Sequence, residues 1–212
     1  MIDYKKVSLS NQIFERLEEE ILNGRYPQGS IISPEMASSD LRVGLGTVKE
    51  ALIRLETERL VEETPAGFRV LGITADDINH IFNIKRKIEA EATALAAENI
   101  SNEDLSELGK VLDRQERAVE AGDTDAVKNL DTMFHDILYA GCGSTTYELI
   151  LSPIHHKLSK YRKASLEKSD RIMNSVKEHR QVYEAMARRD IEEVERLMMI
   201  HIEHAYASIT KG

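Results

Sequence analysis

The sequence predicts a mainly α-helical protein in two parts: a short segment with a small β-hairpin, followed by an antiparallel all-α bundle. Three of the four prolines lie in the first 65 residues of the 212-residue chain. From Thr74 onward, apolar residues recur at helical spacing in long stretches with short breaks. We therefore expect two domains, residues 1–72 and 73–212. The single cysteine, Cys142, excludes a disulfide framework within one chain.

The first segment predicts three helices and a hairpin. Ile13, Leu17 and Ile21 recur at four-residue spacing, and Ser33-Pro34 fits a helix cap followed by proline in the first turn. The expected elements are helices over 9–22, 35–41 and 47–59 and strands over 60–64 and 68–71. This order is typical of a winged helix-turn-helix, although a small α+β domain with no nucleic-acid role shows the same pattern.

The second segment predicts six helices joined by short connections. Capping-box patterns begin at Thr74 and Ser101, and Gly122-Asp123 fits the end of one helix and the cap of the next. The expected helices cover residues 75–99, 102–121, 124–140, 145–167, 171–188 and 191–210. Short connections of this kind are typical of an antiparallel bundle.

Four polar side chains fall on or beside the apolar faces of three of these helices. Asp131 and His135 lie one turn apart beside one face, while His179 and His201 lie inside the faces of the last two helices. Buried carboxylates and imidazoles are costly without partners, and one divalent metal would satisfy all four. Each residue alone is more often a hydrogen-bonded core residue, and Asp131 can simply pair with His135.

The other histidines are weaker candidates. His204 lies at the edge of the last apolar face and would replace His201 if that helix were rotated. His155 is marginal on the same criterion. His80 and His156 fall on faces that we expect to be exposed to solvent.

Three sequence motifs in the first segment resemble the GntR family of bacterial transcription regulators. They are Ile-Leu-Asn-Gly-Arg-Tyr-Pro-Gln-Gly-Ser-Ile-Ile at 21–32, Val-Gly-Leu-Gly-Thr-Val-Lys-Glu-Ala-Leu-Ile-Arg-Leu-Glu at 43–56, and Leu60-Val61 with Gly67-x-x-Val70. The resemblance implies a winged helix that binds operator DNA as a homodimer. The DNA-binding positions that it implies are Gly46, Thr47 and Lys49 on the recognition helix and Gly67 and Arg69 on the wing.

Two departures from that family affect the DNA-binding surface. Leu45 and Glu35 occupy positions where the family usually has arginine, and a leucine side chain donates no hydrogen bond. The chain is acidic, with a formal net charge of −9, although Arg42, Lys49 and Arg54 outnumber the acids around the recognition helix. We expect DNA binding that is weaker or more sensitive to salt than is typical of the family.

The second segment resembles the FCD effector-binding domain, in the six-helix, VanR-like branch. The residues that carry the resemblance are Asp131-Thr-Met-Phe-His135, Glu178-His179 and His201. It implies a divalent metal, zinc or nickel first, held by Asp131, His135, His179 and His201, which helps to bind a small organic acid. Lys85 stands where the family has an effector-facing arginine, four residues before Glu89.

The effector residues that we expect are therefore Lys85, Glu89 and, more weakly, Arg162. The spacing of Lys85 and Glu89 equally favours an internal ion pair between them.

These observations predict a ligand-responsive transcription regulator, with repression as the usual mode of the family, rather than an enzyme. Two alternatives are a metal-dependent hydrolase, for which Glu89 is the inward-facing general-base candidate, and a direct sensor of the metal itself. The chain shows no apolar run long enough for a membrane span and no apolar segment after its charged N-terminus, so we expect a cytoplasmic protein.

Overall fold

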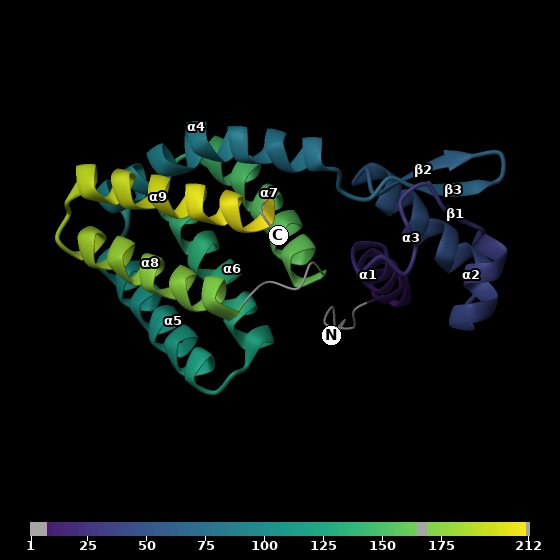
Figure 1. The fold of residues 1–212 in the computed structure, drawn as a ribbon, viewed down its shortest axis with the longest axis horizontal. Helices are drawn as coiled ribbons and strands as arrows, with labels where there is room; N and C mark the ends of the chain where they lie inside the picture. Colours follow the sequence, from purple (N-terminus) through teal and green to yellow (C-terminus); the bar gives the residue numbers. More distant parts are fainter. Residues whose placement is uncertain (1–7, 165–168, 211–212) are drawn as a thin grey trace, which may run out of the picture. The chain divides into compact units, whose positions relative to one another are not determined.

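The computed structural model describes residues 8–164 and 169–210, and the side chains of residues 8–159 and 171–210. The chain divides into two compact units, Met1–Thr74 and Ala75–Gly212 (Figure 1). The predicted fold class is confirmed, because helices dominate and the first unit holds a small antiparallel sheet. The elements are α1 (Leu9–Leu22), β1 (Ile31–Ile32), α2 (Pro34–Leu41), α3 (Leu45–Thr57), β2 (Val61–Thr64), β3 (Gly67–Val70), α4 (Ala75–Asn99), α5 (Asn102–Glu120), α6 (Thr124–Gly141), α7 (Thr145–Ala164), α8 (Ser169–Ala187) and α9 (Ile191–Thr210).

The core of the first unit lies between its helices and its sheet. Leu17 of α1 and Leu52 of α3 are fully buried in this core. The strands have the order β1-β3-β2, all antiparallel. We expected no strand at residues 31–32, yet Ile32 pairs there with Phe68. A two-residue strand is defined by its partner rather than by its own pattern, so local sequence did not reveal it.

The two helices of the helix-turn-helix begin and end at recognisable signals. Ser33 caps α2 by accepting a hydrogen bond from the Met36 amide, and Arg42 ends that helix in the left-handed conformation with φ +55°. We expected α3 to begin at residue 47, but it begins at Leu45. Gly46 therefore lies in the first turn of the recognition helix rather than in the preceding turn.

Glycine is required at the tip of the wing. Gly67, the first residue of β3, has a φ of +125°, which side chains with a Cβ rarely adopt. A Cβ atom at this position would lie 2.7 Å from the carbonyl oxygen of Ile32. The wing thus packs closely on β1 because residue 67 carries no side chain.

The second unit is a bundle of the six helices α4–α9 (Figure 1). Helix α4 packs along α9 and also touches α6, while α8 packs between α5 and α9. Helix α7 ends at Ala164 and α8 begins at Ser169, within three residues of the expected bounds. The guanidinium of Arg189 donates to the carbonyls of Ala97 and Ile100 and so ties the end of α4 to the α8–α9 turn. No helix in the described part of the chain is long and apolar enough to cross a membrane.

Candidate functional site

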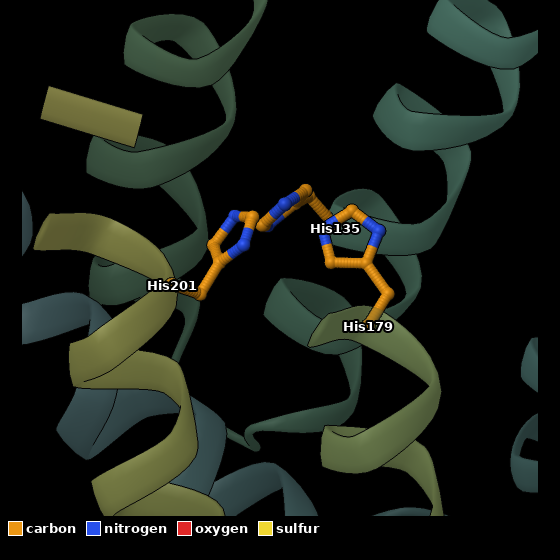
Figure 2. Close-up of side chains that lie close together, drawn as sticks. All are labelled: His135, His179 and His201. Carbon is orange, nitrogen blue, oxygen red and sulfur yellow. The ribbon is translucent and has the colours of Figure 1, made fainter. Parts of the chain in front are cut away.

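Three histidines from three different helices meet inside the bundle. His135 lies on α6, His179 on α8 and His201 on α9, and their exposed fractions are 1%, 0% and 4%. Each offers a ring nitrogen within 4.8 Å of the others. Figure 2 shows the three rings gathered in one place, each reaching in from its own helix. The structure thus brings together three of the four residues that we expected to bind a metal.

The Nδ1 atom of each of these histidines faces a side-chain oxygen atom. Nδ1 of His201 lies 2.8 Å from Oε2 of Glu178, and Nδ1 of His135 lies 3.3 Å from Oε1 of Glu89. Nδ1 of His179 lies 3.5 Å from Oε1 of Gln115. An oxygen acceptor at Nδ1 places the proton there and leaves Nε2 with its lone pair, which is the form that binds a metal.

The fourth expected residue, Asp131, lies beside this cluster on α6. Its Oδ1 is 3.8 Å from Nε2 of His179, and its Oδ2 is 3.2 Å from Nε2 of His155. The Nε2 atom of His179 is buried and has no hydrogen-bond partner among the described residues. A buried polar atom without a partner costs roughly 1–3 kcal/mol, and a metal ion is one group that would occupy this position. The donor set therefore fits a divalent metal.

His155 on α7 is a residue that the sequence analysis ranked too low. It is 2% exposed, its ring centroid is 4.0 Å from that of His135, and with Glu89 and His135 it forms a second group of potential ligands. A signal for it was present, because the buried residues Leu151 and Leu158 place His155 on the inner face of α7. Like that of His179, the Nε2 atom of His155 is buried and has no hydrogen-bond partner among the described residues, although it lies 3.2 Å from Asp131.

Burial sets the ionisation of these groups. It lowers the pKa of His155 and of His179 well below the usual value, and it lowers the pKa of His201 to about 4. Burial alone would raise the pKa of Glu178, but the hydrogen bond from His201 and the charge of Arg171 outweigh it and lower that pKa to about 2. His155, His179 and His201 are thus neutral at pH 7, and Glu178 is ionised.

The expected effector residues Lys85 and Glu89 form an ion pair inside the bundle. Nζ of Lys85 is 2.7 Å from Oε2 of Glu89, and both side chains are buried. The hydroxyl of Tyr139 donates to the other oxygen of Glu89. Burial would raise the pKa of Glu89, yet Lys85 and His135 outweigh it and hold this pKa well below its usual value. The internal pair that the sequence left open is therefore formed, and Arg162 lies outside the residues whose side chains are described.

The expected DNA-binding residues lie on α3 and the wing. Lys49 and Gly46 are exposed, and Thr47 is half-buried. Lys49 and Gly67 line one groove, of about 290 Å³, between the recognition helix and the wing, and Glu35 lines it too. Arg69 is exposed on β3, with its guanidinium 3.3 Å from the carboxylate of Glu62.

Arg54, one of the basic residues counted near the recognition helix, contacts α1. Arg54 donates to Asn11 and stacks on the ring of Phe14 at 4.2 Å from its centroid. The local excess of basic residues counted from the sequence is therefore smaller on the exposed surface. Lys49 lies in a groove whose other charged members, Glu35 and Glu63, are acidic.

A winged helix-turn-helix followed by a helical bundle is an architecture of DNA-binding transcription regulators. The model of "Bacterial regulatory proteins, gntR family" matches residues 9–68, and that of the "FCD domain" matches residues 80–204. The chain belongs to the GntR family of transcription regulators, in the subfamily that carries an FCD domain. The resemblance drawn from the sequence motifs is thus confirmed.

Individual relatives agree with this assignment. The uncharacterized HTH-type transcriptional regulator YdhC of Bacillus subtilis is 24% identical over 91% of this chain and 87% of its own. The HTH-type transcriptional regulator McbR of Escherichia coli is 29% identical over 64% of this chain and 62% of its own. The solved structure of E. coli McbR/YncC superposes with a TM-score of 0.76 at 21% identity, covering 97% of this chain and 98% of that one, which shows the shared fold.

Proposed function

We propose that this transcription regulator is a homodimeric repressor whose helical domain binds a divalent metal and a small organic acid. The metal ligands that we propose are Asp131, His135, His179 and His201. The observation that carries this proposal is the buried Nε2 atom of His179, which has no hydrogen-bond partner in the described part of the chain and lies beside Asp131. When bound, a zinc or nickel ion supplies positive charge at this point.

The surrounding residues support the same proposal. Carboxylate or amide oxygens behind all three histidines fix their rings and their tautomers, as outer partners of metal ligands do. Because the ligands come from α6, α8 and α9, a bound ion would cross-link three helices. The organic acid can control DNA binding only if it binds the DNA-competent and the incompetent forms with different affinity.

We propose that the operator is contacted by α3 and the wing. The backbone at Gly46 and the side chains of Thr47 and Lys49 would enter the major groove, with Gly67 and Arg69 of the wing in the minor groove. The exposed position of Lys49 supports this placement. Leu45 is 38% exposed in the first turn of α3, where it offers the DNA apolar surface instead of a charge.

The hydrolase alternative requires a free general base. Glu89, the inward candidate, is held by Lys85, by Tyr139 and by His135, so it is committed as an acceptor. The relatives are transcription regulators, and this class of protein acts by binding rather than catalysis. We therefore propose that the cluster of histidines is a ligand-binding site for regulation and not a catalytic site.

The test combines metal analysis with DNA binding. Protein purified from its own host is analysed by elemental mass spectrometry and native mass spectrometry, and its operators are selected from genomic DNA fragments. We expect about one zinc or nickel per chain, loss of that metal in His179→Ala, and no loss in His204→Ala, whose ring is largely exposed. If the metal content of His179→Ala equals that of the wild type, the proposed set of metal ligands is wrong.

The same samples separate the repressor from the metal sensor. We expect the metal-loaded protein to bind the selected operator and Lys49→Ala to bind it weakly, with Lys110→Ala on the exposed face of α5 as the control. If removing and restoring the metal alone switches operator binding, the ion is the signal, and the organic acid is not needed.

A further inference from the structure

Helix α8 carries three polar side chains at four-residue spacing, and each has buried atoms without a hydrogen-bond partner among the described residues. They are Arg171, Ser175 and His179. The side chain of Arg171 is 10% exposed, Ser175 is 7% exposed and His179 is fully buried. Residues four apart lie one turn from each other on the same side of a helix. On the same side of α8 as Nε2 of His179, and nearer to the start of the helix, lie the unpartnered donors of Ser175 and Arg171.

Arg171 uses only one part of its guanidinium. Its Nη1 atom is 2.9 Å from each oxygen of Glu178, while Nε and Nη2 are buried and have no hydrogen-bond partner among the described residues. These two atoms form the edge that can hold both oxygens of a carboxylate at once. Leaving such donors buried and unpaired is costly.

Other arginines of this chain show what that edge ordinarily binds. In each of three cases, Nε and Nη2 together hold the two oxygens of one glutamate, at 2.5–3.1 Å. The pairs are Arg86–Glu203, Arg180–Glu116 and Arg196–Glu193. Arg171 lacks this carboxylate, so the partner that completes it has the shape and charge of a carboxylate.

Ser175 connects this position to the cluster of histidines. Its hydroxyl is buried without a partner, and the side chain lines a small cavity of about 20 Å³ together with Gln115 and Asp131. A cavity of this size holds about one water molecule, so a carboxylate that reached Ser175 would have to displace that water and widen the cavity. Lys128 also lines the cavity and adds positive charge.

The ion pair between Lys85 and Glu89 on α4 bears on where an acidic effector can bind. Lys85, the expected partner of an acidic effector, has its Nζ 2.7 Å from Oε2 of Glu89, so its ammonium already has a carboxylate partner, as Nη1 of Arg171 has in Glu178. Arg171 has an unused edge, whereas Lys85 is held by Glu89. We therefore expect the anion to bind at α8 and not at α4.

We propose that the Nε–Nη2 edge of Arg171 and the hydroxyl of Ser175 form a subsite for the carboxylate of a small organic acid. This proposal rests on the proposed effector function and names the residues that hold the acid. The acid would lie beside Asp131 and His179, with its carboxylate held by two donors of Arg171 and one of Ser175.

The test uses formate, the smallest carboxylate, as the probe. The thermal unfolding midpoint of the full chain is measured against formate concentration, with sodium chloride keeping the ionic strength constant, in zinc-loaded and in chelator-treated protein. A ligand that binds the folded state raises this midpoint with concentration. The variants are Arg171→Lys, which keeps the charge beside Glu178, Ser175→Ala, and the control Arg180→Lys, whose fork already holds Glu116.

We expect formate to raise the midpoint of the wild type, and Arg171→Lys to require at least about tenfold more formate for the same shift. Ser175→Ala should require a few-fold more, and Arg180→Lys should respond as the wild type does. An equal response in Arg171→Lys, or no response of the wild type at about 100 mM formate, overturns the subsite.

Zinc analysis of the same samples distinguishes the two proposals. Bound zinc without an Arg171-dependent response overturns the carboxylate subsite and leaves the metal site standing. An Arg171-dependent response in protein that binds no zinc supports the subsite and overturns the proposed metal ligands.

Discussion

The buried ion pair on α4 gives a prediction whose size follows from the structure. Lys85→Met removes the ammonium group and leaves the carboxylate of Glu89, which is fully buried, without its cation. Removing one partner of a buried pair costs about 3–5 kcal/mol. Tyr139 still donates to Glu89, so we expect the lower end, about 3 kcal/mol, or a fall in the unfolding temperature of roughly 10 °C for a unit of this size.

Replacing both charges should remove most of this cost. In the double variant Lys85→Met with Glu89→Gln, no buried charge is left unpaired, and the glutamine oxygen still accepts the hydrogen bond from Tyr139. We expect the double variant to lie within about 1 kcal/mol of the wild type. Lys110→Met, which removes an exposed and paired lysine on α5, should change stability by less than about 0.5 kcal/mol.

Calorimetry is the suitable assay because the two units can unfold in separate transitions. The measurement is made on chelator-treated protein, so that loss of a bound ion adds nothing to the difference. A cost below about 1 kcal/mol for Lys85→Met would refute the reasoning, since a buried carboxylate cannot lose its cation so cheaply. A double variant no more stable than the single one would refute it as well.

Three further predictions address the outer partners of the histidines, the recognition helix and the wing. Glu178→Gln should lower zinc affinity about 10–100-fold in a competition titration, with Glu203→Gln as the control, and equal affinities would contradict an orienting role. Leu45→Arg should raise operator affinity, measured by fluorescence anisotropy, and steepen its dependence on log salt by about one unit; a loss of affinity would contradict the placement of α3. Gly67→Ala should destabilise the first unit in calorimetry by more than about 1 kcal/mol, because its Cβ would meet the Ile32 carbonyl; unchanged stability would contradict the tight wing.

The sequence predicted the helices well because their ends are local. Ser33, Ser101 and Asp123 each cap a helix by accepting a backbone hydrogen bond from within the first turn, and such signals are visible in a few consecutive residues. Strand β1 was missed for the opposite reason. Ile31–Ile32 is a strand only because β3, more than thirty residues later in the chain, pairs with it.

The histidine cluster shows the same division between local and distant information. Helical periodicity placed His135, His179 and His201 on inner faces, which is a property of each helix alone. The partners of these histidines come from other helices, so neither Glu178 behind His201 nor the contact of His155 with Asp131 followed from spacing. Arg54 was counted as a surface charge because periodicity does not reveal that it stacks on Phe14.

The chain connects the proposed effector site to the wing through one helix. Strand β3 ends at Val70 and α4 begins at Ala75, so the first helix of the bundle follows the wing after four residues. The same helix carries Glu89, whose carboxylate lies 3.3 Å from Nδ1 of His135. An ion or acid that shifts His135 must therefore alter the contacts of Glu89 and its pair with Lys85, because buried groups cannot lose partners without cost. We expect such a change to be passed along α4, because rigid secondary elements are among the structures that carry coupling between distant sites.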